Sequence, residues 1–492
     1  MPHLWMLVGS GLCAYGSLTY RGSNIIGHST TTVFKFILSR CQGKIQPKIL
    51  VMLKQRLFKM NGIVNVAFKI PAWQCCRGDR NERLGQTGGV RAMGKETDIV
   101  IVSAVRTAIG RFGGALKEVR ASRLAAHVMQ EALRRAHDLN GDLIDDIVLG
   151  DCIQASDEAN TARTAALMAG LPAQVPAFTV QRQCSSSMQA LVSGVQQIRS
   201  GDSQIVLVAG VESMSSAPYC LPGARWGMRL MNHEITDAVW EILYSGSRVL
   251  GEPMIMGITA ENLAEKYGIS RRDQDEVAVQ SHNRAEAAII AGRFEDEIVS
   301  FEVPGPKGQT TIFEQDEHPR FGLKMDDIAK LKPAFKEGGT VTAGNSSGLN
   351  DGAAAAVVMT RRRAGELGLV PLARIVSYAV VGVEPHLMGY GPVPSTRKAL
   401  SKAGMSPKDI GLVELNEAFA AQYIACERGL DLDRSKTNVN GSGIGLGHPI
   451  GCTGLRILVS LIHEMARRDV EAGLATLCVG GGMGFTTIVA RD

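Results

Sequence analysis

The sequence lacks long apolar runs, and this limits the kinds of protein that it can encode. Its 492 residues are 45% hydrophobic and 21% charged, but the apolar stretches are short and interrupted by polar residues. A helix that spans a bilayer needs about 20 consecutive, mostly apolar residues. We therefore expect no stable membrane insertion, whereas the length is ample for a large core and more than one domain.

Paired Cys-x-x-Cys motifs are absent as well. Ten cysteines in 492 residues do not make a disulfide-rich composition, and adjacent Cys75 and Cys76 are too close for an ordinary bridge. Structural zinc, which such pairs usually hold, is not expected, and we predict no metal site. A reducing compartment is the default interpretation, so we expect a cytoplasmic protein.

Acidic residues are scarce at the start of the chain. The whole sequence has 53 Lys/Arg and 48 Asp/Glu; residues 1–92 hold 13 and 2 of these, which leaves 40 and 46 for residues 93–492. Because this larger part is mildly acidic, its bulk charge gives no case for nucleic-acid binding.

The basic segment 1–92 has three interpretations. The first is a non-native or mis-assigned leader, with translation starting at Met93. The second is an organelle transit segment, since such segments are basic and poor in acids; this interpretation allows a mitochondrial location. The third is an accessory region.

From Met93 onward, short apolar runs alternate with helical patterns, as is typical of α/β proteins. Residues 98–107 predict a first strand, and the continuous aliphatic run at 204–210 predicts a strand that is buried on both faces. The order of helix, strand and glycine that follows Cys184 recurs after His448. We therefore expect two similar halves, residues 93–219 with 341–365 and residues 366–492.

Residues 220–340 interrupt this pattern. They are rich in Met, Arg, Pro and acidic residues, and they predict two helices at about 257–266 and 271–292. Long insertions of this kind usually serve a function, so we expect an inserted loop or lid domain.

Cys184 is a candidate nucleophile. It follows a strand-like run at 178–180 and precedes three serines, which favour the start of a helix. A thiol at a helix N-terminus lies at the positive end of the helix dipole, which favours the thiolate. The alternative is a small buried core cysteine, which is the usual role of a free cysteine.

His448 is a candidate base. It lies between Gly447 and Pro449, and we expect it just before a helix whose dipole lowers its pKa and keeps the imidazole neutral. Glycines at 441, 443, 445, 447 and 451 indicate a tightly bent backbone near a ligand. A turn histidine without a chemical role is the alternative.

Cys478 ends a predicted strand and leads into Gly480 and two further glycines, whose N–H groups can approach a substrate oxygen. A dinucleotide phosphate loop fits poorly, because the run leads into a strand at 485–489 and not into a helix. Asn416 follows a predicted strand at 412–415 and starts a helix. It either caps that helix or orients a water or a carbonyl at the edge of the sheet.

Together, the segments 183–188, 416–419, 447–451 and 478–484 resemble the motifs of the thiolase family in their order and spacing, and so do the segments 330–335 and 341–352. The resemblance covers about residues 97–492. It implies a thiolase-like α/β fold, in which two duplicated halves form a layered α-β-α-β-α core and the inserted loop domain 220–340 binds CoA.

The resemblance also implies an activity. It is the reversible Claisen condensation of two acetyl-CoA to acetoacetyl-CoA and CoA, or thiolysis of a 3-ketoacyl-CoA, by a ping-pong route through an acylated Cys184. CoA and acyl-CoA are then substrates, so no bound cofactor is implied. The family suggests a homotetramer built as a dimer of dimers.

Residue roles follow from the same resemblance. Cys184 is implied as the nucleophile, His448 as the base that activates it, and Cys478 as the second acid/base at the α-carbon of acetyl-CoA. One oxyanion site is implied for His448 with a water held by Asn416, and the other for the backbone N–H groups of Cys184 and Gly480. The implied substrate contacts are Ser347, Arg320, Met256, Ala418 and Phe419.

The chain-length preference stays open, because this chain has Ile255 where many short-chain acetoacetyl-CoA enzymes have a histidine. A degradative 3-ketoacyl-CoA thiolase of fatty-acid β-oxidation is the alternative, and a non-catalytic acyl-CoA or lipid-binding relative is a remote one. Met231, Met254 and Met256 either line an adaptable acyl pocket or belong to the core.

Overall fold

Strands from both halves of the chain join in one continuous sheet. The computed structural model describes residues 94–304 and 309–491, and the segment 1–92 with its three interpretations lies outside the described residues. The sheet runs through β13 (Leu412–Leu415), β14 (Ala472–Val479), β15 (Met483–Ala490), β12 (Ala373–Gly382), β1 (Ile99–Thr107), β11 (Asn350–Thr360), β5 (Ile205–Ser213), β3 (Asp146–Asp151) and β4 (Ala177–Val180).

The two halves of this sheet meet at β1 and β12, which pair antiparallel through Val100 with Arg374 and Ile101 with Ala373. Two short strands extend the sheet: β2 (Gly110–Arg111) pairs with β11, and β8 (Ile298–Val299) pairs with β1. Because β1 and β12 pair over only a short length, the strands of each half can twist independently. The two halves of the sheet therefore face each other across a layer of helices.

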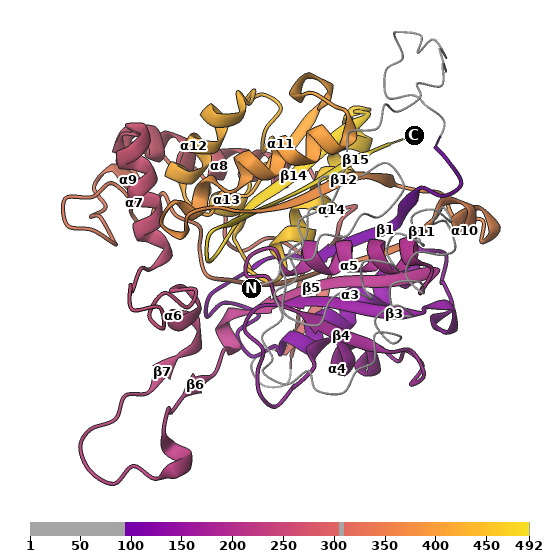
Figure 1. The fold of residues 1–492 in the computed structure, drawn as a ribbon, viewed down its shortest axis with the longest axis horizontal. Helices are drawn as coiled ribbons and strands as arrows, with labels where there is room; N and C mark the ends of the chain where they lie inside the picture. Colours follow the sequence, from indigo (N-terminus) through magenta and orange to yellow (C-terminus); the bar gives the residue numbers. More distant parts are fainter. Residues whose placement is uncertain (1–93, 305–308, 492) are drawn as a thin grey trace, which may run out of the picture. The chain divides into compact units, whose positions relative to one another are not determined.

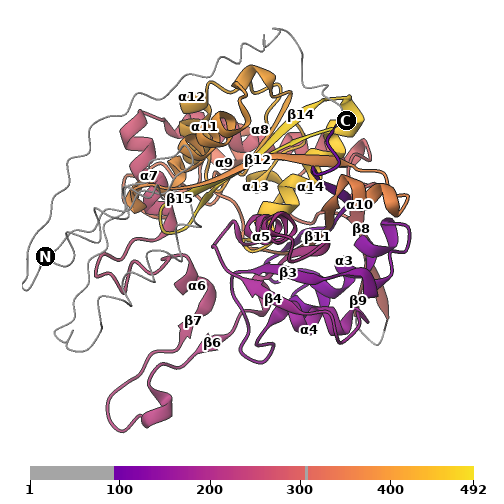
Figure 2. The same ribbon diagram turned by 45° about the vertical axis from the view of Figure 1, so that its right-hand side comes forward.

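Helices lie in three layers around the sheet (Figure 2). The outer layer of the first half is α3 (Ala121–Arg135) with α4 (Thr161–Met168), the central layer is α5 (Ser186–Ser200) with α14 (Thr453–Arg468), and the outer layer of the second half includes α11 (Pro392–Ala403) and α12 (Ala420–Leu430). The predicted α-β-α-β-α arrangement is confirmed.

The alternation of side chains along each strand produces these layers. In β5, Ile205 and Leu207 pack with α3 and α4, whereas Val206 and Val208 pack with α5 and α14. In β14, Leu477 faces the central helices and Leu474 faces α11 and α12. A strand between two apolar layers must be apolar on both faces, which is why the run at 204–210 is continuous.

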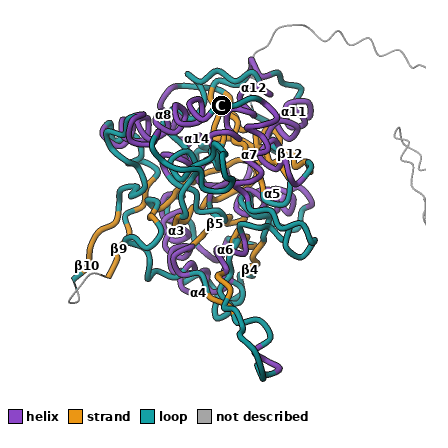
Figure 3. Tube along the Cα trace, turned by 90° about the vertical axis from the view of Figure 1, so that its left-hand side faces the viewer, coloured by secondary structure: helices purple, strands orange, loops and turns teal. Residues whose placement is uncertain are grey.

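The inserted segment has the two helices that the sequence predicts, α7 (Met256–Tyr267) and α8 (Arg271–Ile290). Both pack on the second half, and α8 begins at a capping box between Ser270 and Asp273. The hairpin β6 (Tyr219–Cys220) with β7 (Thr236–Asp237) extends away from the sheet (Figures 1 and 3). The remaining short elements are α6 (Ala238–Ile242), β9 (Phe301–Pro304), β10 (Thr310–Phe313), α9 (Met325–Ala329), α10 (Arg361–Glu366) and α13 (Gly443–Leu446).

The division into residues 93–219 with 341–365, 220–340 and 366–492 stays a proposal for the domain limits. None of the helices in residues 94–304 and 309–491 combines the length and the apolar character that crossing a bilayer requires.

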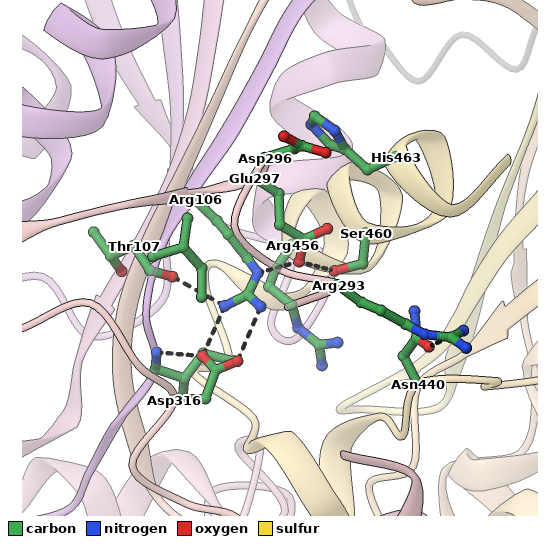
Figure 4. A network of polar contacts seen from close by, with 12 residues as sticks. Arg106, Thr107, Arg293, Asp296, Glu297, Asp316, Asn440, Arg456, Ser460 and His463 are labelled. Atoms are coloured by element: carbon green, nitrogen blue, oxygen red, sulfur yellow. Dashed lines mark hydrogen bonds and ion pairs between the residues drawn. The ribbon is translucent and has the colours of Figure 1, made fainter. Parts of the chain in front are cut away.

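A buried arginine ties the inserted segment to β1 (Figure 4). Arg106 donates from Nε to Glu297 Oε1 at 2.6 Å and from Nη1 and Nη2 to the carboxylate of Asp316 at 2.7 and 2.9 Å. Ser460 of α14 donates to the same Glu297 oxygen at 2.8 Å. All three charged side chains are buried. Their hydrogen-bonded ion pairs offset the free-energy cost of removing these charges from water.

We predict that Arg106→Met lowers the free energy of unfolding by about 3–5 kcal/mol, because it leaves two buried carboxylates without their cation. Urea unfolding followed by circular dichroism measures the change. Arg272→Met is the matched control, since Arg272 forms an exposed pair with Glu276 on α8 and its loss should leave the midpoint unchanged. Equal midpoints for the two variants would contradict the assigned role of Arg106.

Candidate active site

Ser187 holds the start of α5 against the start of α14, one helix from each half of the chain. Its N–H donates to Gly451 O at 3.1 Å, and its Oγ donates to Cys452 O at 2.9 Å. The N–H of Leu455 donates back to Oγ at 2.9 Å. The loop that carries Cys184 and the loop that carries His448 are therefore held at one place.

This close contact depends on glycines beneath it. A Cβ at Gly210 would lie 2.2 Å from Ser187 Cβ, and a Cβ at Gly150 would lie 2.2 Å from the backbone nitrogen of Ser187. Both glycines belong to strands of the first half, so the sheet surface is bare where the helix start rests on it.

Cys184 lies two residues before the first residue of α5. The preceding Gln183 has a φ of 46°, in the left-handed region, and this turns the chain sharply before the thiol. The Gly480 N–H, from the turn between β14 and β15, donates to the Cys184 sulfur. The predicted pair of Cys184 and Gly480 is thus brought together.

The Cys184 thiol is held neutral in the free protein. Although the residue retains some exposure, burial raises the pKa of its thiol to about 11, against the hydrogen bonds from the Gly480 and Cys184 amides. The prediction of a dipole-stabilised thiolate is therefore wrong, because removal of the sulfur from water outweighs the amide dipoles. The thiol needs a base to become nucleophilic.

Cys478 is fully buried near the end of β14. Burial raises the pKa of its thiol well above the ordinary value, and the neighbouring Cys184 raises it further. The two sulfurs therefore interact electrostatically, as the sequence predicts, and both start as protonated thiols.

His448 is a neutral imidazole. Burial lowers its pKa to about 3, and the positive charge of Arg456 contributes in the same direction. The expected direction is confirmed, but the expected cause is wrong: α14 begins at Thr453, five residues after His448, so the imidazole does not lie at the helix N-terminus. Arg456 itself donates to Gly447 O at 3.3 Å and appears beside the Arg106 network in Figure 4.

Hydrogen bonds fix the His448 ring and backbone. The ring Nδ1 lies 2.6 Å from Thr453 Oγ1. The backbone N–H donates to Asn350 Oδ1 at 2.9 Å, and Asn350 Nδ2 donates to Gly110 O at 3.0 Å. A side chain at Gly447 would collide with Asn350, which explains the glycine before the histidine.

Asn416 contacts the other nitrogen of the ring. Its Nδ2 lies 3.5 Å from His448 Nε2, and its N–H donates to Thr476 O of β14 at 3.0 Å. Helix α12 begins at Ala420, so the alternative that Asn416 caps this helix is wrong; the residue lies in the preceding loop. Its Oδ1 is buried and accepts no hydrogen bond from the described residues.

Three of the five predicted substrate contacts lie close together, and a fourth, Arg320, lines a nearby cavity. Ser347 donates its N–H to Ala418 O at 3.0 Å, and the neighbouring Ser346 forms an isolated bridge with Phe419. Arg320 and Ser346 both line a cavity of about 100 Å³, together with His282, His318, Leu323, Ile328, Ala343, Gly344 and Gly348. Ser346 therefore connects the cavity beside the exposed Arg320 with the loop that carries Ala418 and Phe419.

Met256, the fifth, is the first residue of α7 and is partly buried. Ser245 Oγ donates to its sulfur at 3.8 Å, and a Cβ at Gly480 would lie 2.4 Å from the same Oγ. Met254 is also partly buried, whereas Met231 is 84% exposed on the β6–β7 hairpin. The core interpretation of Met231 is therefore wrong, and its acyl-pocket interpretation stays a prediction.

Sequence reasoning missed Ser187, Asn350 and Thr453 as parts of the site. From the sequence, Ser187 was interpreted only as a residue that favours the start of a helix. Asn350 lies within the segment 341–352, and Thr453 lies just after the segment 447–451, and neither was assigned a role. No pattern along the chain marks them, because each acts through a partner that is at least five residues away.

Within residues 94–304 and 309–491, no group of three or more His, Cys, Asp or Glu is placed to hold a metal ion.

Known proteins share this arrangement over its full length. The thiolase N-terminal domain family matches residues 99–362, and the thiolase C-terminal domain family matches residues 369–491. The acetyl-CoA acetyltransferases of Cupriavidus necator and Pseudomonas aeruginosa are both 50% identical to this chain, over 400 and 395 residues, which is 80% of this chain and 100% of each relative.

Solved structures agree. Acetyl-CoA acetyltransferase from Bacillus anthracis is 54% identical, with a TM-score of 0.78 over 80% of this chain and 98% of that one. Human mitochondrial 3-ketoacyl-CoA thiolase is 43% identical, with a TM-score of 0.77 over 81% and 100%. The chain belongs to the thiolase family. The predicted family, the fold class and the expectation of an acyltransferase are confirmed.

We predict that iodoacetamide alkylates Cys184 about tenfold faster per pH unit between about pH 7 and pH 9, because a thiol with a pKa of about 11 is almost fully protonated there. Mass spectrometry of the Cys184 peptide measures the rate, with the exposed Cys220 as internal reference. An alkylation rate that no longer rises above about pH 7 would indicate a thiolate–imidazolium pair of Cys184 and His448. It would contradict the assignment of a neutral thiol and a neutral imidazole.

Proposed function

We propose that this protein is an acetyl-CoA C-acetyltransferase that condenses two acetyl-CoA to acetoacetyl-CoA and CoA, and that also runs in the direction of thiolysis. The observation that carries the proposal is that Ser187 holds together the loops of two sets of groups from both halves. One set is the Cys184 thiol with the Gly480 N–H and the Cys478 thiol, and the other is the His448 imidazole with the Asn416 amide. The named relatives support the acetyl-CoA substrate.

Acyl transfer begins at Cys184. Its sulfur attacks the thioester carbonyl of acetyl-CoA while its proton passes to His448 Nε2, and the departing CoA sulfur takes the proton of Cys478, which becomes a thiolate. The developing oxyanion in this step lies at the N–H groups of Cys184 and Gly480, which already point at the sulfur. The product is an acetyl group on Cys184.

Carbon–carbon bond formation needs the second thiol. The Cys478 thiolate left by the first step removes a proton from the α-carbon of the second acetyl-CoA, and the resulting enolate attacks the acetyl carbonyl on Cys184, whose sulfur leaves and takes the proton held by His448. The enolate oxygen is stabilised by His448 Nε2–H and by a water molecule at Asn416, whose buried Oδ1 has no partner among the described residues. In thiolysis the protonated Cys478 donates to the same carbon, in accord with its raised pKa.

The path from Arg320 past Ser347, Ala418 and Phe419 is proposed to hold the CoA arm, with its negatively charged nucleotide end at Arg320 and its thioester near Cys184. Met256 lies near the acyl end, through Ser245 beside Gly480. The proposed chemistry uses no bound cofactor or metal, and a cytoplasmic location remains a prediction.

We predict that Cys184→Ala abolishes thiolysis of acetoacetyl-CoA by free CoA, followed as loss of substrate absorbance. Cys478→Ser should reduce turnover at least about 100-fold while acetylation of Cys184 remains detectable, because the hydroxyl is a much weaker acid and base at the α-carbon. Cys220→Ser is the matched control, since this cysteine is exposed on the β6–β7 hairpin. Turnover by the Cys184→Ala protein at the control rate would refute the proposal.

A degradative 3-ketoacyl-CoA thiolase is the second candidate, and the human mitochondrial structure supports it through its similarity. The same assay with 3-ketoacyl-CoA of increasing chain length separates the two. A kcat/KM that falls steeply beyond the four-carbon substrate supports the acetyl-CoA enzyme, and a level or rising series supports the degradative one.

We also propose a homotetramer, built as a dimer of dimers. The β6–β7 hairpin carries large apolar side chains that are more than half exposed, namely Tyr219, Trp226, Leu230, Met231 and Ile235. Several exposed large apolar side chains on one hairpin favour an interface between copies of the chain.

Trp226→Glu combined with Leu230→Glu is expected to reduce the assembly from four chains to two, because each copy then presents charge where it presented apolar surface. Size-exclusion chromatography with light scattering measures the mass. A wild-type protein that is monomeric, or a double variant that keeps the tetramer mass, would contradict this role of the hairpin.

A further inference from the structure

A serine of the inserted segment holds the loop that precedes His448. Ser281 lies on α8, and its Oγ accepts the N–H group of Ser442 at 3.2 Å and that of Gly445 at 3.0 Å. Both donors lie in residues 442–447, which include α13 and lead into the histidine. The contact is tight, since a Cβ at Gly445 would lie 2.5 Å from Ser281 O. The inserted segment therefore supplies a hydrogen-bonding side chain behind the candidate active site.

The proton of the Ser281 hydroxyl is donated to Glu417, the residue that follows Asn416. Ser281 Oγ donates to Glu417 Oε2 at 2.5 Å, and the N–H group of Ile444 donates to the same oxygen at 3.3 Å. The other oxygen, Oε1, accepts from Asn438 Nδ2 at 2.8 Å. All three partners are donors, so the carboxylate form of Glu417 fits this position, although burial raises its pKa.

This network joins α8 to the end of β13. Asn438 Oδ1 accepts the N–H group of Leu415 at 2.8 Å, and its Nδ2 donates to Leu415 O at 2.8 Å. The side chains of Ser281, Glu417 and Asn438 are all buried, so water does not readily replace a partner that is removed. The network is therefore expected to hold its members in one arrangement.

The loop held in this way supports the Asn416 amide. A Cβ at Gly443 would lie 2.7 Å from Asn416 Oδ1 and 2.6 Å from Glu417 O, so the backbone of Gly443 lies directly against the amide. Among the described residues, the amide itself makes one weak polar contact, at 3.5 Å to His448 Nε2. Its orientation therefore depends on the loop that packs against it.

The imidazole, in contrast, has anchors outside this network. His448 Nδ1 contacts Thr453 Oγ1, and the backbone N–H group of His448 donates to Asn350 Oδ1. Loss of the contact between Ser281 and Glu417 should therefore displace the Asn416 amide more than the imidazole.

We propose that Ser281 and Glu417 are positioning residues that together hold the Asn416 amide opposite His448 Nε2. Neither side chain touches the substrate in the proposed mechanism. The amide serves the enolate oxygen in carbon–carbon bond formation, whereas the oxyanion of acylation lies at two backbone N–H groups elsewhere in the site. The inference rests on the proposed function, and it adds that the inserted segment supports one half-reaction more than the other.

The test measures the two half-reactions separately. Glu417→Gln keeps the size of the side chain but turns an N–H group toward a donor, and Ser281→Ala removes the hydroxyl. We expect each variant to lower kcat for acetoacetyl-CoA thiolysis about 10–100-fold with KM within about twofold, because a small displacement of an oxyanion-stabilising group has an effect of this size. Acetylation of Cys184 by acetyl-CoA, followed by mass spectrometry in a single turnover, should stay within about threefold of the wild-type rate.

A double variant tests whether the two side chains act as a unit. Ser281→Ala combined with Glu417→Gln should lower kcat by much less than the product of the two single effects, because the first substitution already removes the shared hydrogen bond. Asn283→Ala is the matched control, since Asn283 is an exposed residue of the same helix and its loss should leave kcat unchanged.

Circular dichroism and thermal melting check the fold of each variant, and two substitutions on different elements keep the test open if one protein does not fold. Acetylation that slows as much as thiolysis would indicate a general loss of site structure and would overturn the inference. Wild-type thiolysis by both single variants, or single effects that multiply in the double variant, would overturn it as well. Thiolysis by Cys184→Ala at the control rate would instead overturn the proposed function.

Discussion

The site depends on the contact in which Ser187 joins the start of α5 to the start of α14. Each helix belongs to a different half of the chain, and each half alone supplies only part of the chemistry: Cys184 from one, and His448, Asn416 and Cys478 from the other. The three hydrogen bonds of one buried serine, with bare glycine surface beneath it, fix the distance between these parts. A stacked pair of α/β halves with helices between them provides this meeting point without any long loop.

Burial governs the electrostatics of the site more than helix dipoles do. It raises the pKa of both thiols and lowers that of the imidazole, so that each group is uncharged before substrate arrives. Burying a neutral group costs little free energy. Proton transfer during the reaction then creates charge at positions where backbone and side-chain amides can already stabilise it. Arg456, a buried cation next to the His448 loop, further favours the neutral ring.

Local sequence patterns predicted the elements well, because strand alternation and helix periodicity are local properties. The strand at 412–415 is β13 as predicted, and the helices at 257–266 and 271–292 are α7 and α8 with small shifts at their ends. Of the motif residues, Cys184 lies near Cys478, and His448 lies near Asn416. What failed was the reasoning that placed them at helix starts, since the turn after His448 and the loop after Asn416 each extend several residues before the helix begins.

Other features required tertiary information. Whether Met231 is core or surface depends on a hairpin that leaves the sheet, and its own sequence mixes apolar with charged residues. The charge state of Cys184 depends on how much protein surrounds the sulfur, and the roles of Ser187 and Thr453 depend on partners across the site.

The central claim is that the Cys184 sulfur carries the acyl group between the two substrates. Its most direct test is peptide mass spectrometry of the enzyme mixed with acetyl-CoA and quenched in acid within a single turnover. The account predicts one acetyl group, on Cys184, formed together with an equal amount of free CoA and removed when CoA is added back. An acetyl group on Cys478, or full turnover without any acetylated Cys184, would contradict it.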